Sequence, residues 1–248
     1  VNYLKDIVTE GDFGMSYFSG RPVFDEIWPR FLVTIRMSLL ILVISVCVGV
    51  PVGIYSAVKQ YSLWDTVPTM MAFFLAAVPS FVIGMVLMYF FALKINIFPS
   101  FGLSGLKSYI LPVSAVAISE AAAYLRFTKS SMLEAIRQDY VRTARGKGVP
   151  ERTVIWKHAM RNALLPVITC VGMRFGVLLA GMVTTERLFS IPGIGSLIVD
   201  SISKKDEPVI IAASILIASA FTMLMLLVDI AYAYVDPRIR AKYSRLER

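Results

Sequence analysis

Few residues in this chain have the type and spacing that catalysis requires. Its only histidine, His158, lies in a strongly basic segment with no nucleophile arranged around it. Glu120 and Asp229 fall in apolar runs but are isolated, whereas an intramembrane enzyme needs paired catalytic groups. No G-x-x-x-x-G-K-[ST] phosphate-binding loop occurs, so the chain is not expected to bind ATP itself. The sequence therefore predicts no catalytic residue, no cofactor and no metal site of its own.

Charged residues inside apolar runs are the remaining candidates, because they are costly in a membrane and are commonly paired or functional. Glu120 lies about eleven residues inward from Tyr109. Arg174 lies about eleven residues inward from Ala163, counted from the opposite side. The two reach a similar depth, and we expect them either to pair or to line a translocation pathway. Glu186 lies near an outer end, where a short reach to the polar surface suffices.

Long apolar runs contain these charged residues. The chain has 248 residues, 57% apolar and 17% charged, whereas soluble domains are about 25% charged. The apolar residues gather in runs near or above the roughly 20 residues that cross a bilayer as a helix. We expect five membrane-spanning helices, at 31–58, 67–93, 109–128, 163–189 and 208–235. Pro51, Pro79 and Pro166 fall within these runs, and each should kink its helix or end a turn.

The basic residues between the spans predict an orientation. Segment 129–162, Lys59 and the C-terminal tail together carry about twice as many Lys and Arg residues as the other side, which assigns them to the cytoplasm. The segments placed outside are 1–30, 94–108 and 190–207. This orientation explains the net charge of +8 better than nucleic-acid binding does. An odd number of spans with a cytoplasmic C-terminus puts Val1 outside, so we expect a sixth helix to precede it.

The cytoplasmic segment 129–162 contains a helical pattern followed by a break. An apolar stripe at helical spacing runs along its first part, formed by Ile136, Tyr140, Val141 and Ala144. Gly146 and Gly148 then break the helix, and Pro150 begins the next segment. A surface helix lying on anionic lipid headgroups would show a similar pattern. The tyrosine-bearing stripe and the glycine pair fit a helix seated in a partner's groove better.

This segment resembles the EAA motif, the loop by which membrane subunits of ABC importers engage their ATPases, in the form typical of the peptide and nickel branch. The matching stretches are Asp139-Tyr140-Val141-Arg142-Thr143-Ala144-Arg145-x-Lys147-Gly148 and His158-Ala159-x-Arg161-Asn162-Ala163-Leu164-Leu165-Pro166. Further matches to that branch are Gly11-Asp12-Phe13-Gly14-x-Ser16 with Gly20-Arg21-Pro22-Val23, Phe189-Ser190-Ile191-Pro192-Gly193-Ile194-Gly195 with Pro208-Val209-Ile210, and Asp236-Pro237-Arg238-Ile239-Arg240. Arg142-Thr143-Ala144 replaces the literal Glu-Ala-Ala, which is usual for this branch.

The resemblance implies an all-α membrane protein, a polytopic helical bundle with the architecture of a type I ABC importer permease. Its parts would be an external segment 1–30, a transmembrane permease domain 31–240 that includes loop 129–162, and a cytoplasmic tail 241–248. The chain would not be an enzyme. It would form half of the translocation pathway for di- or oligopeptides in a bacterial or archaeal cytoplasmic membrane. Nickel or a metal chelate is the alternative solute in that branch.

The resemblance also implies partners and residue roles. The partners are a second, homologous permease in a heterodimer, two cytoplasmic ATPases that hold ATP and Mg²⁺, and an external solute-binding protein. ATPase coupling is assigned to Asp139, Tyr140, Val141, Arg142, Thr143, Ala144, Arg145 and Gly148. An external gate or a docking point for the binding protein is assigned to Ser190, Pro192, Gly193 and Gly195. The rival interpretation, a secondary transporter or channel, predicts inverted repeats, and the sequence shows no convincing one.

Overall fold

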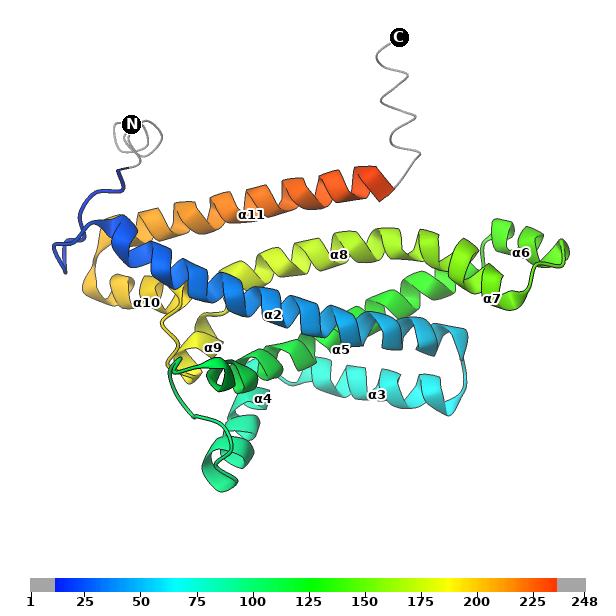
Figure 1. The fold of residues 1–248 in the computed structure, drawn as a ribbon, viewed down its shortest axis with the longest axis horizontal. Helices are drawn as coiled ribbons and strands as arrows, with labels where there is room; N and C mark the ends of the chain where they lie inside the picture. The colour runs from blue at the N-terminus through cyan, green and yellow to red at the C-terminus, as the bar shows by residue number, and fades with distance from the viewer. Residues whose placement is uncertain (1–11, 236–248) are drawn as a thin grey trace, which may run out of the picture. The chain divides into compact units, whose positions relative to one another are not determined.

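The computed structural model describes residues 12–235, and its regular secondary structure in that range is helical (Figure 1). The first eleven residues, with Gly11 of the N-terminal motif, lie outside the described residues. So do the C-terminal motif at 236–240 and the tail 241–248. The all-α prediction is confirmed.

The helices follow one another with short connections. Their bounds are α2 Val23–Val58, α3 Leu63–Ala77, α4 Ser80–Leu87, α5 Ile110–Ile136, α6 Asp139–Gly146, α7 Glu151–Thr153, α8 Met160–Gly181, α9 Val183–Leu188, α10 Ile194–Lys204 and α11 Glu207–Val235. Met88–Lys94 and Val154–Ala159 are π-helical, and Leu106–Tyr109 is a 3₁₀ turn. Within the described range, four helical stretches are long and apolar enough to cross a membrane, and α3 with α4 makes a fifth if the pair crosses as one span.

The predicted span 67–93 is not one continuous helix. The chain leaves α3 at Val78, whose backbone is extended, and α4 begins directly after Pro79. Proline lacks an N–H and disfavours the helical conformation in the residue before it, so Pro79 ends α3 as the sequence predicts. In contrast, α2 and α8 continue through Pro51 and Pro166. The predicted span 163–189 is also divided, because α8 ends before α9 begins.

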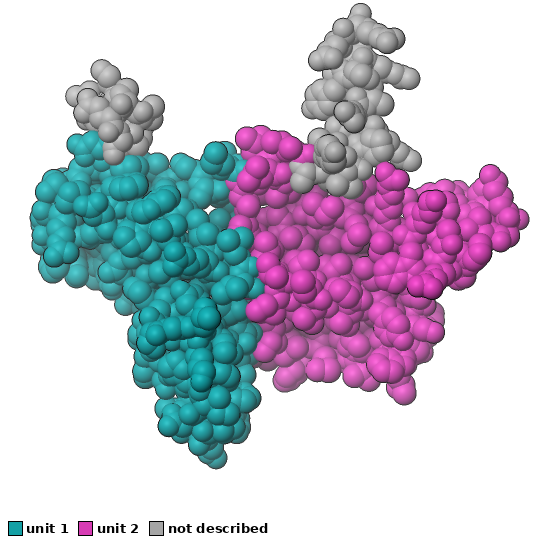
Figure 2. All heavy atoms as spheres, in the orientation of Figure 1, with its two compact units in different colours: residues 1–40, 81–116, 176–223 teal, residues 41–80, 117–175, 224–248 magenta. Residues whose placement is uncertain are grey.

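The chain divides into two compact units, each assembled from separate stretches of sequence (Figure 2). The first unit comprises residues 1–40, 81–116 and 176–223. The beginning of α2, α10 and the beginning of α11 supply its apolar core. The buried residues of this core are Val23, Ile27, Phe31, Ile194, Leu197, Val209, Ala212 and Ala213. This core therefore fixes α10 and the turn that precedes it.

The second unit comprises residues 41–80, 117–175 and 224–248. Its larger core gathers residues from α2, α5, α6, the π-helical turn and α8, and we call it the loop core. The buried members of the loop core are Ile54, Ala57, Met132, Ala135, Val141, Ala144, Val154, Ile155, Ala159 and Ala163. Since half of these residues belong to segment 139–162, this loop is packed onto the spans of its own unit.

Two glycines of α2 allow α5 to approach closely within the second unit. A Cβ atom placed on Gly49 would lie 2.5 Å from the carbonyl oxygen of Ala121, and one on Gly53 would lie 2.7 Å from that of Leu125. Small residues four positions apart let two helix backbones meet in this way. The same contact brings α5, which carries Glu120, Arg126 and Lys129, against α2.

Candidate functional site

Loop 129–162 has the helix, break and second helix that its sequence predicts. Helix α6 ends at Gly146, and Gly148 has a φ of 75°, a left-handed conformation that glycine adopts without a steric penalty. Pro150 precedes the short helix α7 and caps its N-terminal end. The glycine pair therefore reverses the chain so that the loop's second helix can return toward the membrane span α8.

Two members of the predicted apolar stripe of α6, Val141 and Ala144, face inward, whereas a third, Tyr140, is exposed. Val141 is 0% exposed and Ala144 is 7% exposed, because both pack in the loop core against Val154, Ile155 and Ala159 of the π-helical turn. A later turn of the same chain therefore covers part of the stripe, and the seating of α6 in a partner's groove stays a prediction. The outward face of α6 instead carries Asp139, Tyr140, Arg142, Thr143 and Arg145.

Helix α6 is tied to α7 by an ion pair at the surface. The Arg145 guanidinium donates two hydrogen bonds to the Glu151 carboxylate, at 3.0 Å from Nε and 2.7 Å from Nη2. These hydrogen bonds raise the pKa of Arg145 above its ordinary value. Exposed pairs contribute little to stability, so the role of this one is to fix the orientation of α6 relative to α7. The exposed Tyr140 lies at the start of α6 and takes no part in this ion pair.

Glu120 and Arg174, which the sequence places at similar depth, form a bidentate ion pair between α5 and α8. Nε and Nη2 of Arg174 donate to the two carboxylate oxygens of Glu120, at 2.7 and 3.0 Å. The Glu120 side chain is 14% exposed and that of Arg174 is 40% exposed. Arg174 therefore keeps an accessible edge while its charge is neutralised. A role of either residue in a translocation pathway stays a prediction.

A cavity of about 690 Å³ opens beside this pair in the second unit. Its walls come from α3, α5 and α8, and its lining includes Thr69, Phe73, Arg126, Lys129, Cys170 and Arg174. Cavities of about 300–1,000 Å³ with mixed apolar and polar walls are typical of small-molecule sites. The arrangement can therefore hold a small polar solute, with cations rather than carboxylates on its walls.

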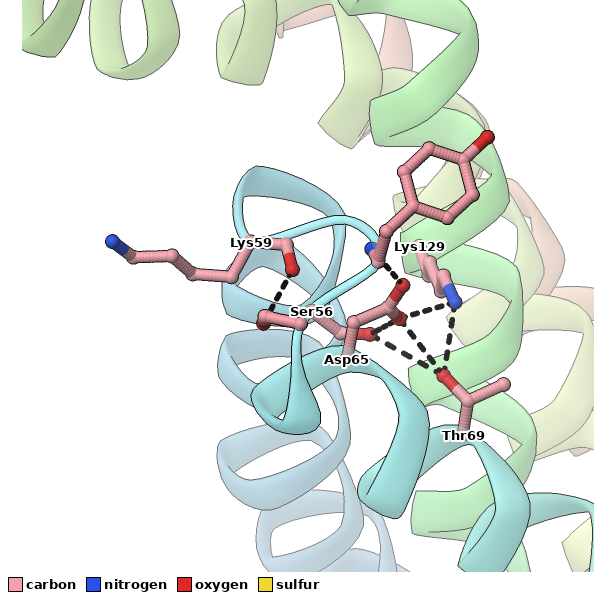
Figure 3. Close-up of polar contacts among 7 residues, drawn as sticks. Ser56, Lys59, Asp65, Thr69 and Lys129 are labelled. Carbon is pink, nitrogen blue, oxygen red and sulfur yellow. Dashed lines mark hydrogen bonds and ion pairs between the residues drawn. The ribbon is translucent and has the colours of Figure 1, made fainter.

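A second buried charge cluster, which the sequence reasoning missed, centres on Asp65 (Figure 3). Its carboxylate pairs with the Lys129 ammonium and accepts hydrogen bonds from Ser56 Oγ at 2.6 Å and Thr69 Oγ1 at 3.2 Å. The other carboxylate oxygen accepts the backbone N–H of Tyr61 at 3.0 Å. The cluster joins α2, α3 and α5 at one point. An aspartate at the start of an apolar helix was the signal that could have revealed it.

The predicted external gate is organised around Glu186, which is 0% exposed. The expectation that Glu186 reaches the polar surface is wrong. Its carboxylate accepts hydrogen bonds from Thr34 Oγ1 at 2.7 Å and from the backbone N–H of Ser196 at 2.8 Å. A Cβ atom on Gly193 would collide with this carboxylate, so glycine is required there. The buried Glu186 carboxylate therefore holds this turn together from inside.

The other gate residues shape the same turn. Ser190 has a positive φ of 51°, and the backbone N–H of Ile194 donates to Thr34 Oγ1 at 3.0 Å. A Cβ atom on Gly195 would lie 2.7 Å from a methyl group of Val183. Pro192 is exposed in the segment between α9 and α10, directly before Gly193. These contacts make the turn rigid, whereas its part in gating or docking stays a prediction.

Replacing Glu186 with Gln is expected to destabilise the first unit. The amide offers one acceptor oxygen where the carboxylate offers two, so one of the two buried donors loses its partner, at a cost of about 1–3 kcal/mol. The melting temperature of the protein in mild detergent measures the effect. The matched control is Glu134→Gln, because Glu134 is exposed and its change is expected to stay within about 0.5 kcal/mol. Equal melting temperatures for the two variants would contradict the role given to Glu186.

The N-terminal motif is fixed to the junction between α10 and α11 in the first unit. Ser16 Oγ donates to one carboxylate oxygen of Asp206 at 2.5 Å, and the backbone N–H of Tyr17 donates to the other at 3.0 Å. Asp206 is 3% exposed, so these hydrogen bonds are shielded from solvent. The motif therefore holds a tight turn against the start of α11.

Comparison with known proteins gives a consistent result. Residues 49–241 match the family described as binding-protein-dependent transport system inner membrane component. The chain is 40% identical over 235 residues to the glutathione transport system permease protein GsiC of Salmonella choleraesuis (strain SC-B67), covering 95% of this chain and 77% of the relative. It is 39% identical over 241 residues to GsiC of Escherichia coli (strain K12), covering 97% and 78%.

Solved structures of ABC transporters share the fold. An inward-facing structure of the MetNI methionine ABC transporter superposes with a TM-score of 0.70 at 14% identity, covering 84% of this chain and 95% of that chain. An amino acid ABC transporter crystallised with histidines gives a TM-score of 0.63 at 14% identity, covering 96% and 99%. At these identities the likeness concerns the fold.

Proposed function

The chain belongs to the family of binding-protein-dependent transport system inner membrane components, and on that premise we propose that it carries glutathione or related small peptides as one of two unlike permeases. It is a multi-pass inner membrane permease of an ABC importer, and the ATPase of such an importer is a separate subunit. The observation that carries the substrate proposal is the 40% identity to a glutathione permease over 95% of this chain.

The proposed coupling element is the outward face of α6. Because Val141 and Ala144 are buried in the loop core, α6 is held against the spans of its unit and can transmit a push. Tyr140 is 39% exposed on the opposite face, and tyrosine is enriched at the energetic centres of protein interfaces. Closure of the ATPases on ATP would move α6 and favour the outward-open state, since only differential contacts shift such an equilibrium.

The proposed assembly contains four kinds of chain. A second, homologous permease completes the pathway, two cytoplasmic ATPases hold ATP and Mg²⁺, and a solute-binding protein delivers the solute from outside. Lipid is the remaining partner, and nucleic acid is not one. The basic segment 129–162 supports a cytoplasmic loop and, with it, a cytoplasmic C-terminus.

Purification of the whole importer in mild detergent, followed by reconstitution, tests the proposal. We expect two ATPases and a second permease to co-purify with the full-length protein. We expect proteoliposomes that contain ATP and receive the binding protein outside to accumulate radiolabelled glutathione. A homo-oligomer without ATPases would refute the assembly. Proteoliposomes that accumulate Ni²⁺ but not glutathione would refute the proposed substrate and leave the proposed importer standing.

A further inference from the structure

The cavity in the second unit has an unbalanced set of charges on its walls. Three basic residues line it, namely Arg126, Lys129 and Arg174, and its lining includes no Asp or Glu side chain. Charged groups inside membrane proteins are costly and are retained mainly where they are paired or functional. Whether each of the three cations already has a counter-ion therefore decides which of them is available to a solute.

Two of the three cations are neutralised by carboxylates that lie behind the walls. Lys129 pairs with Asp65, whose side chain is 7% exposed, and also donates to Thr69 Oγ1 at 3.0 Å. Arg174 makes its bidentate pair with Glu120. Each pair is held by further contacts of its own helices, so neither cation can turn to a solute without leaving a buried carboxylate unpaired.

Arg126 makes no ion pair with any residue between positions 12 and 235, the range that the structure describes. Its guanidinium carbon lies 4.6 Å from the centre of the Phe73 ring, a cation–π contact between α5 and α3. Both residues line the cavity, and Arg126 is exposed. The contact with Phe73 holds the guanidinium at the cavity wall, and no described residue forms a hydrogen bond with its N–H groups. Arg126 lies on α5 between one member of each neutral pair. Lys129 follows it by three positions, and Glu120 precedes it by six.

We propose that Arg126 is the carboxylate-binding residue of the translocation cavity. A planar guanidinium presents two parallel N–H donors that match the two oxygens of a carboxylate, and such pairs are among the stronger hydrogen bonds in proteins. Glutathione carries two carboxylates and every free peptide carries one, so the inference rests on the proposed function and names the group of the solute that is bound. The two neutral pairs keep the remaining cavity from holding an anion too tightly for release.

The local charge is tested first without any substrate. Ser130 lines the same cavity one helical turn after Arg126, so Ser130→Cys places a thiol beside the guanidinium. In the purified importer, alkylation of the introduced thiol by iodoacetate is compared with alkylation by neutral iodoacetamide, and mass spectrometry identifies the modified peptide. Adding Arg126→Gln is expected to lower the iodoacetate-to-iodoacetamide rate ratio about threefold to tenfold. An unchanged ratio would overturn the proposal.

Uptake then tests the role in transport. The probes are glutathione and its bis-amide, in which both carboxylates are replaced, and the readout is ATP-dependent uptake into proteoliposomes with the same binding protein throughout. Arg126→Gln is expected to lower the ratio of glutathione uptake to bis-amide uptake about tenfold, because one charge-assisted pair is lost. Arg126→Lys should recover part of the ratio. The matched control is Arg36→Gln, which removes an exposed arginine of α2 outside the cavity.

The outcomes separate this inference from the proposed function. An equal loss of both probes in Arg126→Gln would mean that Arg126 acts only on folding or assembly, which overturns the proposal. If the wild type transports glutathione and Arg126→Gln leaves the uptake ratio unchanged, the carboxylate contact is overturned and the proposed function stands. A wild-type importer that transports neither probe would refute the proposed substrate class, and the carboxylate contact with it.

Discussion

Neutralising either partner of the Glu120–Arg174 pair is expected to destabilise the second unit, and exchanging the two residues is expected to restore most of the loss. Breaking a fully buried pair costs about 3–5 kcal/mol, because the remaining charge is left without a partner. Since Arg174 is 40% exposed, we expect about 1–3 kcal/mol here. Arg174→Gln should cost more than Glu120→Gln, because the glutamate left behind is only 14% exposed.

The exchanged variant, Glu120→Arg with Arg174→Glu, distinguishes a structural pair from a pathway residue. Recovery should be incomplete even for a purely structural pair, because Arg174 also lies 5.9 Å from the centre of the Tyr124 ring and the exchange removes that contact. The melting temperature in mild detergent reports stability, and glutathione uptake reports transport. Recovery of both would identify a structural pair. Recovery of stability without transport would place one of the two charges on the path of the solute.

An exposed ion pair of the first unit supplies the control. Arg187 Nη2 lies 2.6 Å from Asp200 Oδ1, and both side chains are more than two-fifths exposed. Exposed pairs typically contribute about 0–1 kcal/mol, so Asp200→Asn should leave the melting temperature nearly unchanged. A loss as large as that of Glu120→Gln would show that burial does not set the strength of these pairs.

The sequence predicted that Glu120 and Arg174 lie at a similar depth, either paired or lining a pathway, because a helix has a fixed rise for each residue. Two charges at equal distances from the ends of antiparallel spans must lie at similar depth, whatever the rest of the packing. The depth of Asp65 could not be predicted in this way, because Asp65 lies at the beginning of a helix whose limits depend on the turn before it. Its pairing with Lys129 was therefore missed. Lys129 therefore entered only as a loop charge that indicates orientation.

Amphipathic periodicity predicted the buried side of α6 for Val141 and Ala144, but it included the exposed Tyr140 and did not show what covers that side. The same stripe of apolar residues would fit a partner's groove, a lipid surface or the chain's own core, since the pattern records only that the face is buried. Tertiary contacts with the later π-helical turn decide among these, and such a turn has no clear sequence signal. Glu186 shows the related limit, because its distance from the span's end predicted access to water while the fold encloses it among donors.

The adjacent residues Tyr140 and Val141 allow one substitution to be compared on the two faces of α6. Tyr140→Asp places a carboxylate on the exposed face and should change the free energy of unfolding by no more than about 0.5 kcal/mol, measured through the melting temperature. Val141→Asp places the same carboxylate in the loop core, where Val141 is 0% exposed, and should cost more than about 3 kcal/mol. The two variants have the same charge and differ by one position in sequence.

Transport then shows whether the exposed face of α6 meets the ATPase. If it does, Tyr140→Asp lowers glutathione uptake and ATPase co-purification about tenfold or more although the protein remains folded, because a tyrosine at the centre of an interface typically contributes 2 kcal/mol or more. Tyr140→Phe keeps the ring and should keep most of the activity. A folded Tyr140→Asp variant with normal uptake would exclude this face as the coupling surface. The push of the ATPases would then have to enter through another exposed part of segment 129–162, for which Trp156, 54% exposed beside Arg152 and Lys157, is the next candidate.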